Sequence, residues 1–142
     1  MANNNRNNKR NNNNKRYTGN NVSPLSGPLQ MSGYALRLIK NMAYGEFNME
    51  RDGHLFQTYE FLSVAINVAK NKLYENQVYM QALDFSYGNT NDSVIIKMKN
   101  KHRRAVDAWN YVYNTLGCMI TTKDMGLLAG MMNRLSDYKY DL

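Results

Sequence analysis

From residue 31 onward, the hydrophobic positions of this chain recur three and four residues apart, which is the spacing of an α-helix. The pattern predicts a first helix over residues 32–45, with Ser32 as its N-terminal cap. After a polar break it predicts a second helix over residues 55–83. Only Asn76 interrupts the apolar seam of that second helix.

A third helix is predicted over residues 95–119, because apolar positions again alternate at three and four residues. A polar loop at residues 86–92 precedes it, and we expect Asp92 or Ser93 to cap the helix. His102 falls on the apolar seam of this helix. At such a position we expect a histidine that is hydrogen-bonded by a neighbour, rather than a catalytic base or a metal ligand.

A fourth helix is predicted to begin at Thr121, since Thr121 and Asp124 stand three residues apart, as in a capping box. The strand-like runs of the sequence are too short to build a sheet. The fold class is therefore predicted to be all-α. We expect a four-helix bundle dominated by a long antiparallel hairpin of the second and third helices.

The second predicted helix is longer than a compact domain of this size needs, at about 45 Å for about 30 residues. Its apolar surface also extends beyond a single seam. Two explanations stay open: other helices of the same chain cover this second face, or another chain does. In the fourth helix, small residues four positions apart allow a second helix to approach closely. The candidate oligomer-interface residues are Phe61, Val64, Val68, Gly126 and Gly130.

The first 30 residues have a different composition. Residues 3–21 contain 11 asparagines and five basic residues, and they have too few apolar side chains to form a core. We expect this arm to be disordered when it is free. Both prolines of the chain lie in residues 22–30, which predicts an extended connector. The predicted organisation is an arm and connector over residues 1–30, followed by a helical domain over residues 31–142.

The positive charge of the chain is concentrated in the arm. The 142 residues include 18 Lys and Arg against 11 Asp and Glu, a net charge of +7, and five of those cations precede residue 22. The cations of the arm can neutralise phosphates, but nothing in the arm predicts readout of bases. The alternative is an inert, solvated extension. The candidate nucleic-acid-binding residues of the arm are Arg6, Lys9, Arg10, Lys15 and Arg16.

A second basic cluster lies in the third predicted helix, where residues 97–104 carry five positive charges. Lys97, Lys101 and Arg104 share one side of that helix by their spacing. We regard these three as further candidates for phosphate contact. A solvated helix face and a contact with an acidic protein are the alternatives.

Signatures of catalysis are missing from the sequence. It has two histidines and one cysteine, and no metal-ligand spacing, paired carboxylates or glycine-rich phosphate loop. We therefore expect no enzymatic activity, no metal and no cofactor. The sequence also shows no signal peptide and no apolar stretch long enough to span a membrane. The lone Cys118 cannot form an intrachain disulfide, so we expect a location in a virion or in the host cytoplasm.

These features favour a non-enzymatic structural or assembly protein. It would form homo-oligomers through its helices and contact nucleic acid non-specifically through its arm. The bias towards Asn, Lys and Tyr is typical of an AT-rich genome, which favours a bacteriophage virion or packaging component with other virion or assembly proteins as partners. The alternative is a helical connector or adaptor subunit of a ring, whose arm becomes ordered on neighbouring protein subunits.

Overall fold

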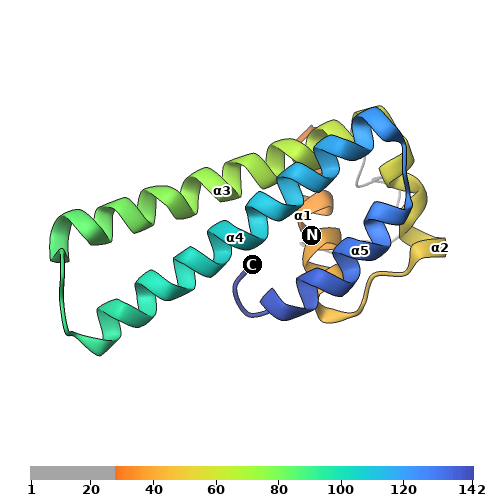
Figure 1. Cartoon of the computed structure of the whole chain (residues 1–142). Coiled ribbons are helices and arrows are strands. Elements are labelled where there is room, and N and C mark those ends of the chain that lie inside the picture. The colour runs from red at the N-terminus through yellow and green to blue at the C-terminus, as the bar shows by residue number, and fades with distance from the viewer. Residues whose placement is uncertain (1–27) are drawn as a thin grey trace, which may run out of the picture. The chain divides into compact units, whose positions relative to one another are not determined.

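The computed structural model of this protein describes residues 28–142, with side chains from Gln30 onward, and all regular structure in that part of the chain is helical (Figure 1). The all-α class is thus confirmed. The helices are α1 (Pro28–Tyr44), α2 (Met49–Asp52), α3 (Tyr59–Tyr87), α4 (Ser93–Thr122) and α5 (Gly126–Leu135), with 3-10 helices η1 (Gly53–Gln57) and η2 (Ser136–Tyr138).

The chain divides into two units between Tyr34 and Ala35, so α1 crosses the division. The helix begins at Pro28, where proline is favoured because its missing N–H would have no helical partner and its φ is already helical. Ser32 lies inside α1, so its predicted role as a cap is wrong. The predicted domain boundary after residue 30 stays a prediction.

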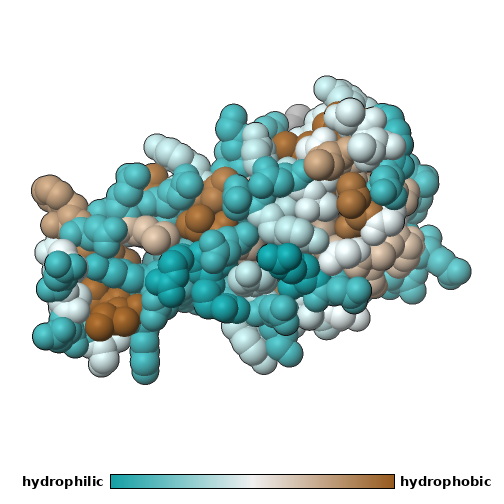
Figure 2. Space-filling view, in the orientation of Figure 1, coloured by the Kyte–Doolittle hydropathy of each residue, from teal (hydrophilic) through white to brown (hydrophobic). Residues whose placement is uncertain are grey.

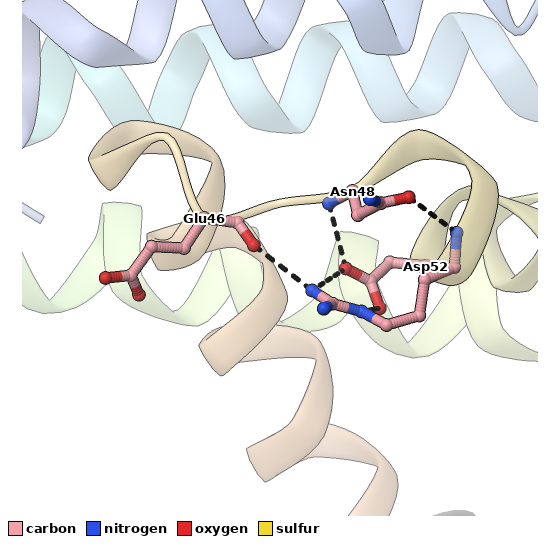
Figure 3. Close-up of polar contacts among 4 residues, drawn as sticks. Glu46, Asn48 and Asp52 are labelled. Atoms are coloured by element: carbon pink, nitrogen blue, oxygen red, sulfur yellow. Dashed lines mark hydrogen bonds and ion pairs between the residues drawn. The ribbon is translucent and has the colours of Figure 1, made fainter.

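The polar stretch between α1 and α3, predicted as a simple break, contains α2 and η1. The side chain of Asn48 caps α2 by accepting a hydrogen bond from the Arg51 N–H at 2.9 Å (Figure 3). Asp52 accepts one hydrogen bond from the Asn48 N–H at 3.0 Å and two from the Arg51 guanidinium at 2.9 and 2.8 Å. The guanidinium also donates to the Glu46 carbonyl oxygen at 3.2 Å. These bonds fold the segment into a closed turn.

Aromatic side chains at both ends of this turn anchor it in the core. Phe47 and Phe56 are buried, and their rings meet edge to face with centroids 6.0 Å apart. Phe56 meets Phe61 of α3 in the same way, at 5.1 Å. The segment therefore contributes to the core, although its overall polarity predicts only a loop.

α3 begins at Tyr59 because the side chain of Thr58 caps it, accepting a hydrogen bond from the Phe61 N–H at 3.3 Å. The predicted cap of α4 is confirmed, since Asp92 accepts a hydrogen bond from the Val94 N–H at 2.9 Å. α4 continues to Thr122, so the predicted capping box at Thr121 is wrong. The helix ends at Lys123, whose φ of 59° turns the chain out of the helix.

α3 and α4 are joined by a short loop and lie side by side (Figure 1). Asp84 near the end of α3 forms an ion pair with Lys99 near the start of α4, at 3.0 Å. Further from the loop, the Asn76 side chain of α3 contacts the His102 side chain of α4 at 2.8 Å. The two helices thus stay in contact away from the loop.

The core of the unit Ala35–Leu142 lies at the other end of these helices. Trp109 of α4 is its largest fully buried side chain. The buried residues of α3 fall between Phe61 and Ala69, and those of α4 between Ala105 and Met119. Residues 70–104 contain no buried residue. The helices α3 and α4 therefore extend well beyond the core that they help to form.

Candidate interaction surface on α3 and α4

The part of α3 and α4 that extends beyond the core, residues 70–104, is called the distal segment below. Eight of the eleven large hydrophobic residues that are exposed in the described chain lie in it. Figure 2 shows apolar atoms open to solvent over the end of α3 and α4 that carries the connecting loop. The eight residues are Tyr74, Val78, Tyr79, Phe85, Tyr87, Val94, Ile96 and Met98.

Some of these residues continue the face of the helices that is buried in the core. Met98 lies seven residues before Ala105, which is two helical turns, so the two residues share a face of α4. Ala105 is buried, whereas Met98 is 43% exposed. On α3, Tyr79 lies three turns after the buried Val68 and is 52% exposed. The core-facing side of both helices therefore continues uncovered into the distal segment.

A polar pair joins the two helices within the distal segment. The Asn76 Oδ1 atom lies 2.8 Å from His102 Nδ1, and the Asn76 amide donates to the Lys72 carbonyl oxygen at 2.8 Å. The Tyr79 ring stacks on the His102 ring, with centroids 5.0 Å apart. The prediction that a neighbour satisfies His102 is confirmed. The two polar interruptions of the predicted seams satisfy each other.

The predicted basic cluster of α4 divides into paired and unpaired cations. Arg104 forms an ion pair with Asp141 at 2.9 Å and donates to the Asp137 carbonyl oxygen at 2.6 Å. The hydrogen bond with Asp141, together with the charge of that carboxylate, raises the pKa of Arg104. A phosphate at Arg104 would have to compete with this carboxylate, and the role of Arg104 in nucleic-acid binding stays a prediction.

Lys99 is also engaged, since its ammonium group contacts Asp84 at 3.0 Å and donates to the Gly88 carbonyl oxygen at 2.7 Å. Lys97, Lys101 and Arg103 are exposed and have no acidic partner among the described residues. The structure thus leaves two of the three predicted cations of α4 available to an anionic partner. The arm residues Arg6 to Arg16 lie outside the described residues.

The five predicted oligomer-interface residues differ in burial. Phe61 and Val68 are buried, because their own chain covers that part of α3, and their role at an interface stays a prediction. Val64 is partly exposed, and its role stays a prediction. A Cβ atom on Gly130 would lie 3.8 Å from the Tyr111 hydroxyl of α4, while one on Gly126 would lie 3.0 Å from the Asp124 carboxylate.

Charge is also unevenly distributed over the helices. The distal segment contains seven basic and three acidic residues, a net of +4, while the rest of the chain after residue 27 contains six basic and eight acidic residues, a net of −2. Within the distal segment, residues 84–92 carry two acids and no base, and residues 97–104 carry five cations. In the structure one of these two acids, Asp84, is paired with Lys99, and Arg104 is paired with Asp141, so part of this charge is already neutralised within the chain.

Outside the distal segment, a hollow of about 480 Å³ between α3 and the end of α4 is lined by Ile66, Tyr113 and Cys118, among others. A cavity of about 210 Å³ is lined mainly by apolar side chains, among them Phe56, Leu62 and Met119, with Lys123 and Gln57 as polar members. That volume is below the roughly 300–1,000 Å³ of typical small-molecule sites. Residues 28–142 contain no group of three or more His, Cys, Asp or Glu side chains that could hold a metal ion. No helix in that range combines the length and apolar character that crossing a membrane requires.

Comparison with protein-family models, with curated proteins and with solved structures gives no match. A functional argument for this chain therefore depends on its own residues. Among residues 28–142, the distal segment contains most of the exposed large hydrophobic residues together with unpaired cations, so it is the candidate functional site.

Proposed function

We propose that this protein is a non-enzymatic structural or assembly protein that forms homo-oligomers and contacts nucleic acid non-specifically. In this proposal the helices form a four-helix bundle that is dominated by a long antiparallel hairpin of α3 and α4. The observation that carries the proposal is the distal segment, which combines eight exposed large hydrophobic residues with unpaired cations. Large exposed apolar patches on a helical surface are typical of interaction sites.

The nucleic-acid part of the proposal depends on cations that can reach phosphates. Lys97 and Lys101 lie one helical turn apart on an exposed side of α4. Contacts of this kind follow the phosphate backbone and read no base sequence. The five cations of the arm would add to the same non-specific attraction.

The setting that we propose is a bacteriophage virion or its packaging machinery, located in the virion or the host cytoplasm. The Asn-rich and Lys-rich composition supports an AT-rich genome of origin. Other virion or assembly proteins would then be partners. A connector or adaptor ring subunit is the second candidate, and the exposed hydrophobic residues favour it, because they suit a protein partner better than DNA.

The experiment that tests the nucleic-acid contact compares Lys97→Gln/Lys101→Gln with the unmodified chain. Duplex DNA affinity is measured by fluorescence anisotropy between 50 and 200 mM salt. Losing two phosphate contacts should reduce the slope of log K against log salt by about 1.8. The matched control is Arg104→Gln, which should change the slope less because Asp141 already neutralises that cation. An unchanged slope in the double variant would assign Lys97 and Lys101 to solvent.

A further inference from the structure

The segment that follows α5 contacts one cation of the basic cluster on α4. Residues 136–142, called the strap below, comprise η2 and the turn after it. Arg104 donates two hydrogen bonds to the strap, from Nε to the Asp141 carboxylate at 2.9 Å and from Nη2 to the Asp137 carbonyl oxygen at 2.6 Å. The Arg104 guanidinium also lies over the Tyr138 ring, 4.9 Å from its centroid. A single cation of α4 therefore makes three contacts with the strap.

The strap has no buried residue to anchor it. Leu135, the last residue of α5, is buried, but every residue of the strap is exposed or only partly buried. The Tyr140 ring meets the ring of Tyr44, at the end of α1, edge to face with centroids 6.5 Å apart. The Arg104 side chain is itself 48% exposed, and ion pairs at such positions are weak. A competing anion can therefore displace the strap from Arg104 while the core stays folded.

Arg104 lies where it would extend a pair of available cations. Lys97, Lys101 and Arg104 follow one another at four and three residues, so they lie on one side of α4. The two lysines have no acidic partner among the described residues. A polyanion bound to them brings further phosphates close to Arg104. Guanidinium groups form charge-assisted hydrogen bonds with phosphates as they do with carboxylates, so such a phosphate competes directly with Asp141.

We infer that the strap is an autoinhibitory element of α4: the Asp141 carboxylate occupies Arg104 in the free protein, and a nucleic-acid phosphate takes its place on binding. The inference rests on the proposed nucleic-acid contact and adds its regulation. With the strap in place, this side of α4 offers two cations to a phosphate backbone, and with the strap displaced it offers three. Asp137 adds a second negative charge to the strap, which further opposes the approach of a phosphate.

Asp141→Asn tests the inference on the full chain. Duplex DNA affinity is measured by fluorescence anisotropy between 50 and 200 mM salt. Without the competing carboxylate, Arg104 becomes a further phosphate contact. The slope of log K against log salt should become steeper by up to about 0.9, so the loss of affinity across this salt range should grow by up to about 3.5-fold. A slope equal to that of the unmodified chain would overturn the inference.

The effect of Asp141→Asn should depend on Arg104. In an Arg104→Gln background, Asp141→Asn should leave the slope unchanged, because the cation that the strap covers is gone. An equally steepened slope in that background would show that Asp141 acts only as a nearby negative charge, and the inference would be wrong. The matched control is Asp107→Asn, which removes an exposed acid of α4 that forms no ion pair among the described residues. It should leave the slope nearly unchanged.

Displacement of the strap can be observed directly by nuclear magnetic resonance. Duplex DNA added to the unmodified chain should move the backbone amide signals of residues 136–142 towards their positions in Arg104→Gln, where the strap has lost its contacts with that cation. If the amide signals of Lys97 and Lys101 respond to DNA while those of the strap do not, the strap stays in place and the inference is overturned.

The same measurements separate this inference from the proposed function. An unmodified chain that binds DNA with the same slope as Asp141→Asn removes the role of the strap and keeps the nucleic-acid contact. If neither protein binds DNA at 50 mM salt, the nucleic-acid part of the proposed function is wrong, and its regulation by the strap is wrong with it.

Discussion

Asp52 shows how a single charged residue organises the turn between α1 and α3. It is the only buried charged residue in the described chain, and every bond that keeps it ionised comes from within four residues. The hydrogen bonds from Arg51, opposed by burial and assisted by the Asn48 N–H, lower the pKa of Asp52 from its ordinary value of 3.8. The carboxylate therefore stabilises the fold in its charged form.

Replacing Asp52 with Asn should destabilise the protein by about 1–2 kcal/mol at pH 7, because the Arg51 guanidinium and the Asn48 N–H lose a charged acceptor. Since the folded pKa is lower than the unfolded one, the contribution of Asp52 is complete well above pH 3.8 and is lost as the pH falls through the folded pKa. Urea unfolding between pH 7 and pH 2 measures it. The difference between the two proteins should shrink below about pH 4.

The control for this substitution is Glu50→Gln, an exposed acid in the same short helix. Its effect should stay within about 0.5 kcal/mol at pH 7. An Asp52→Asn penalty that is equally large at pH 2 and pH 7 would show that the side chain acts through packing and not through its charge.

Arg104 shows that the ion-pair partner of a residue is not predicted by its neighbours in the sequence. Helical spacing places Lys97, Lys101 and Arg104 on one side of α4, and this much is available from the sequence. The ion pair that engages Arg104 comes from Asp141, 37 positions along the chain. Helical periodicity describes neighbours within a helix and carries no information about such a distant partner.

Individual helices were predicted well where their seams are long and regular. α4 (Ser93–Thr122) contains the whole of the predicted helix 95–119, and α3 (Tyr59–Tyr87) contains most of the predicted helix 55–83, whose first residues lie in η1. The start of each helix depends on a side-chain cap. The sequence identifies Asp92 as the cap of α4 but does not identify Thr58 as the cap of α3. The buried Phe47 and Phe56 were also missed, because short polar segments show no period, although two large aromatic side chains in such a segment are themselves a signal.

The exposed distal segment could not be predicted from these seams. A seam shows which face of a helix is apolar, but it does not show where the covering helices end. Met98 and Ala105 are equivalent positions of one pattern, and only the fold makes one exposed and the other buried. Phe61 and Val68, which the sequence predicts at an oligomer interface, are buried within the single chain, whereas the exposed apolar face lies further along α3 and on α4.

The pair Asn76 and His102 should fix how α3 and α4 align along their length. A single Asn76→Leu or His102→Leu variant leaves a half-buried polar group without its partner and should cost about 1 kcal/mol. The double variant Asn76→Leu/His102→Leu replaces both by apolar groups and should cost less than the sum of the two single variants. Urea unfolding of the four proteins gives the coupling energy.

Additive single and double variants would mean that the two side chains do not interact in solution. The control pair is Asn71→Leu with His102→Leu, since Asn71 lies on α3 but is exposed and has no hydrogen bond with His102 among the described contacts. That pair should be additive within about 0.5 kcal/mol.

At the level of the whole chain, charge separates into distinct parts. The arm carries +5 by sequence, the distal segment +4, and the remaining described helices −2. A net charge of +7 therefore describes no single part of this protein. Anionic partners should be attracted to the arm and the distal segment, whereas the core part of the helical unit should contribute little to that attraction.

The arm can be tested separately from the distal segment by changing its charge without changing its length. Substituting Arg6, Lys9, Arg10, Lys15 and Arg16 with Gln removes up to five phosphate contacts, which should reduce the slope of log K against log salt on duplex DNA by up to about 4.5. Fluorescence anisotropy from 50 to 200 mM salt measures the slope. The control replaces five arm asparagines with Gln, which preserves the charge and should leave the slope unchanged. If the five-cation variant keeps the original slope, the arm does not contact phosphates, and the proposal that it becomes ordered on neighbouring protein subunits is favoured instead.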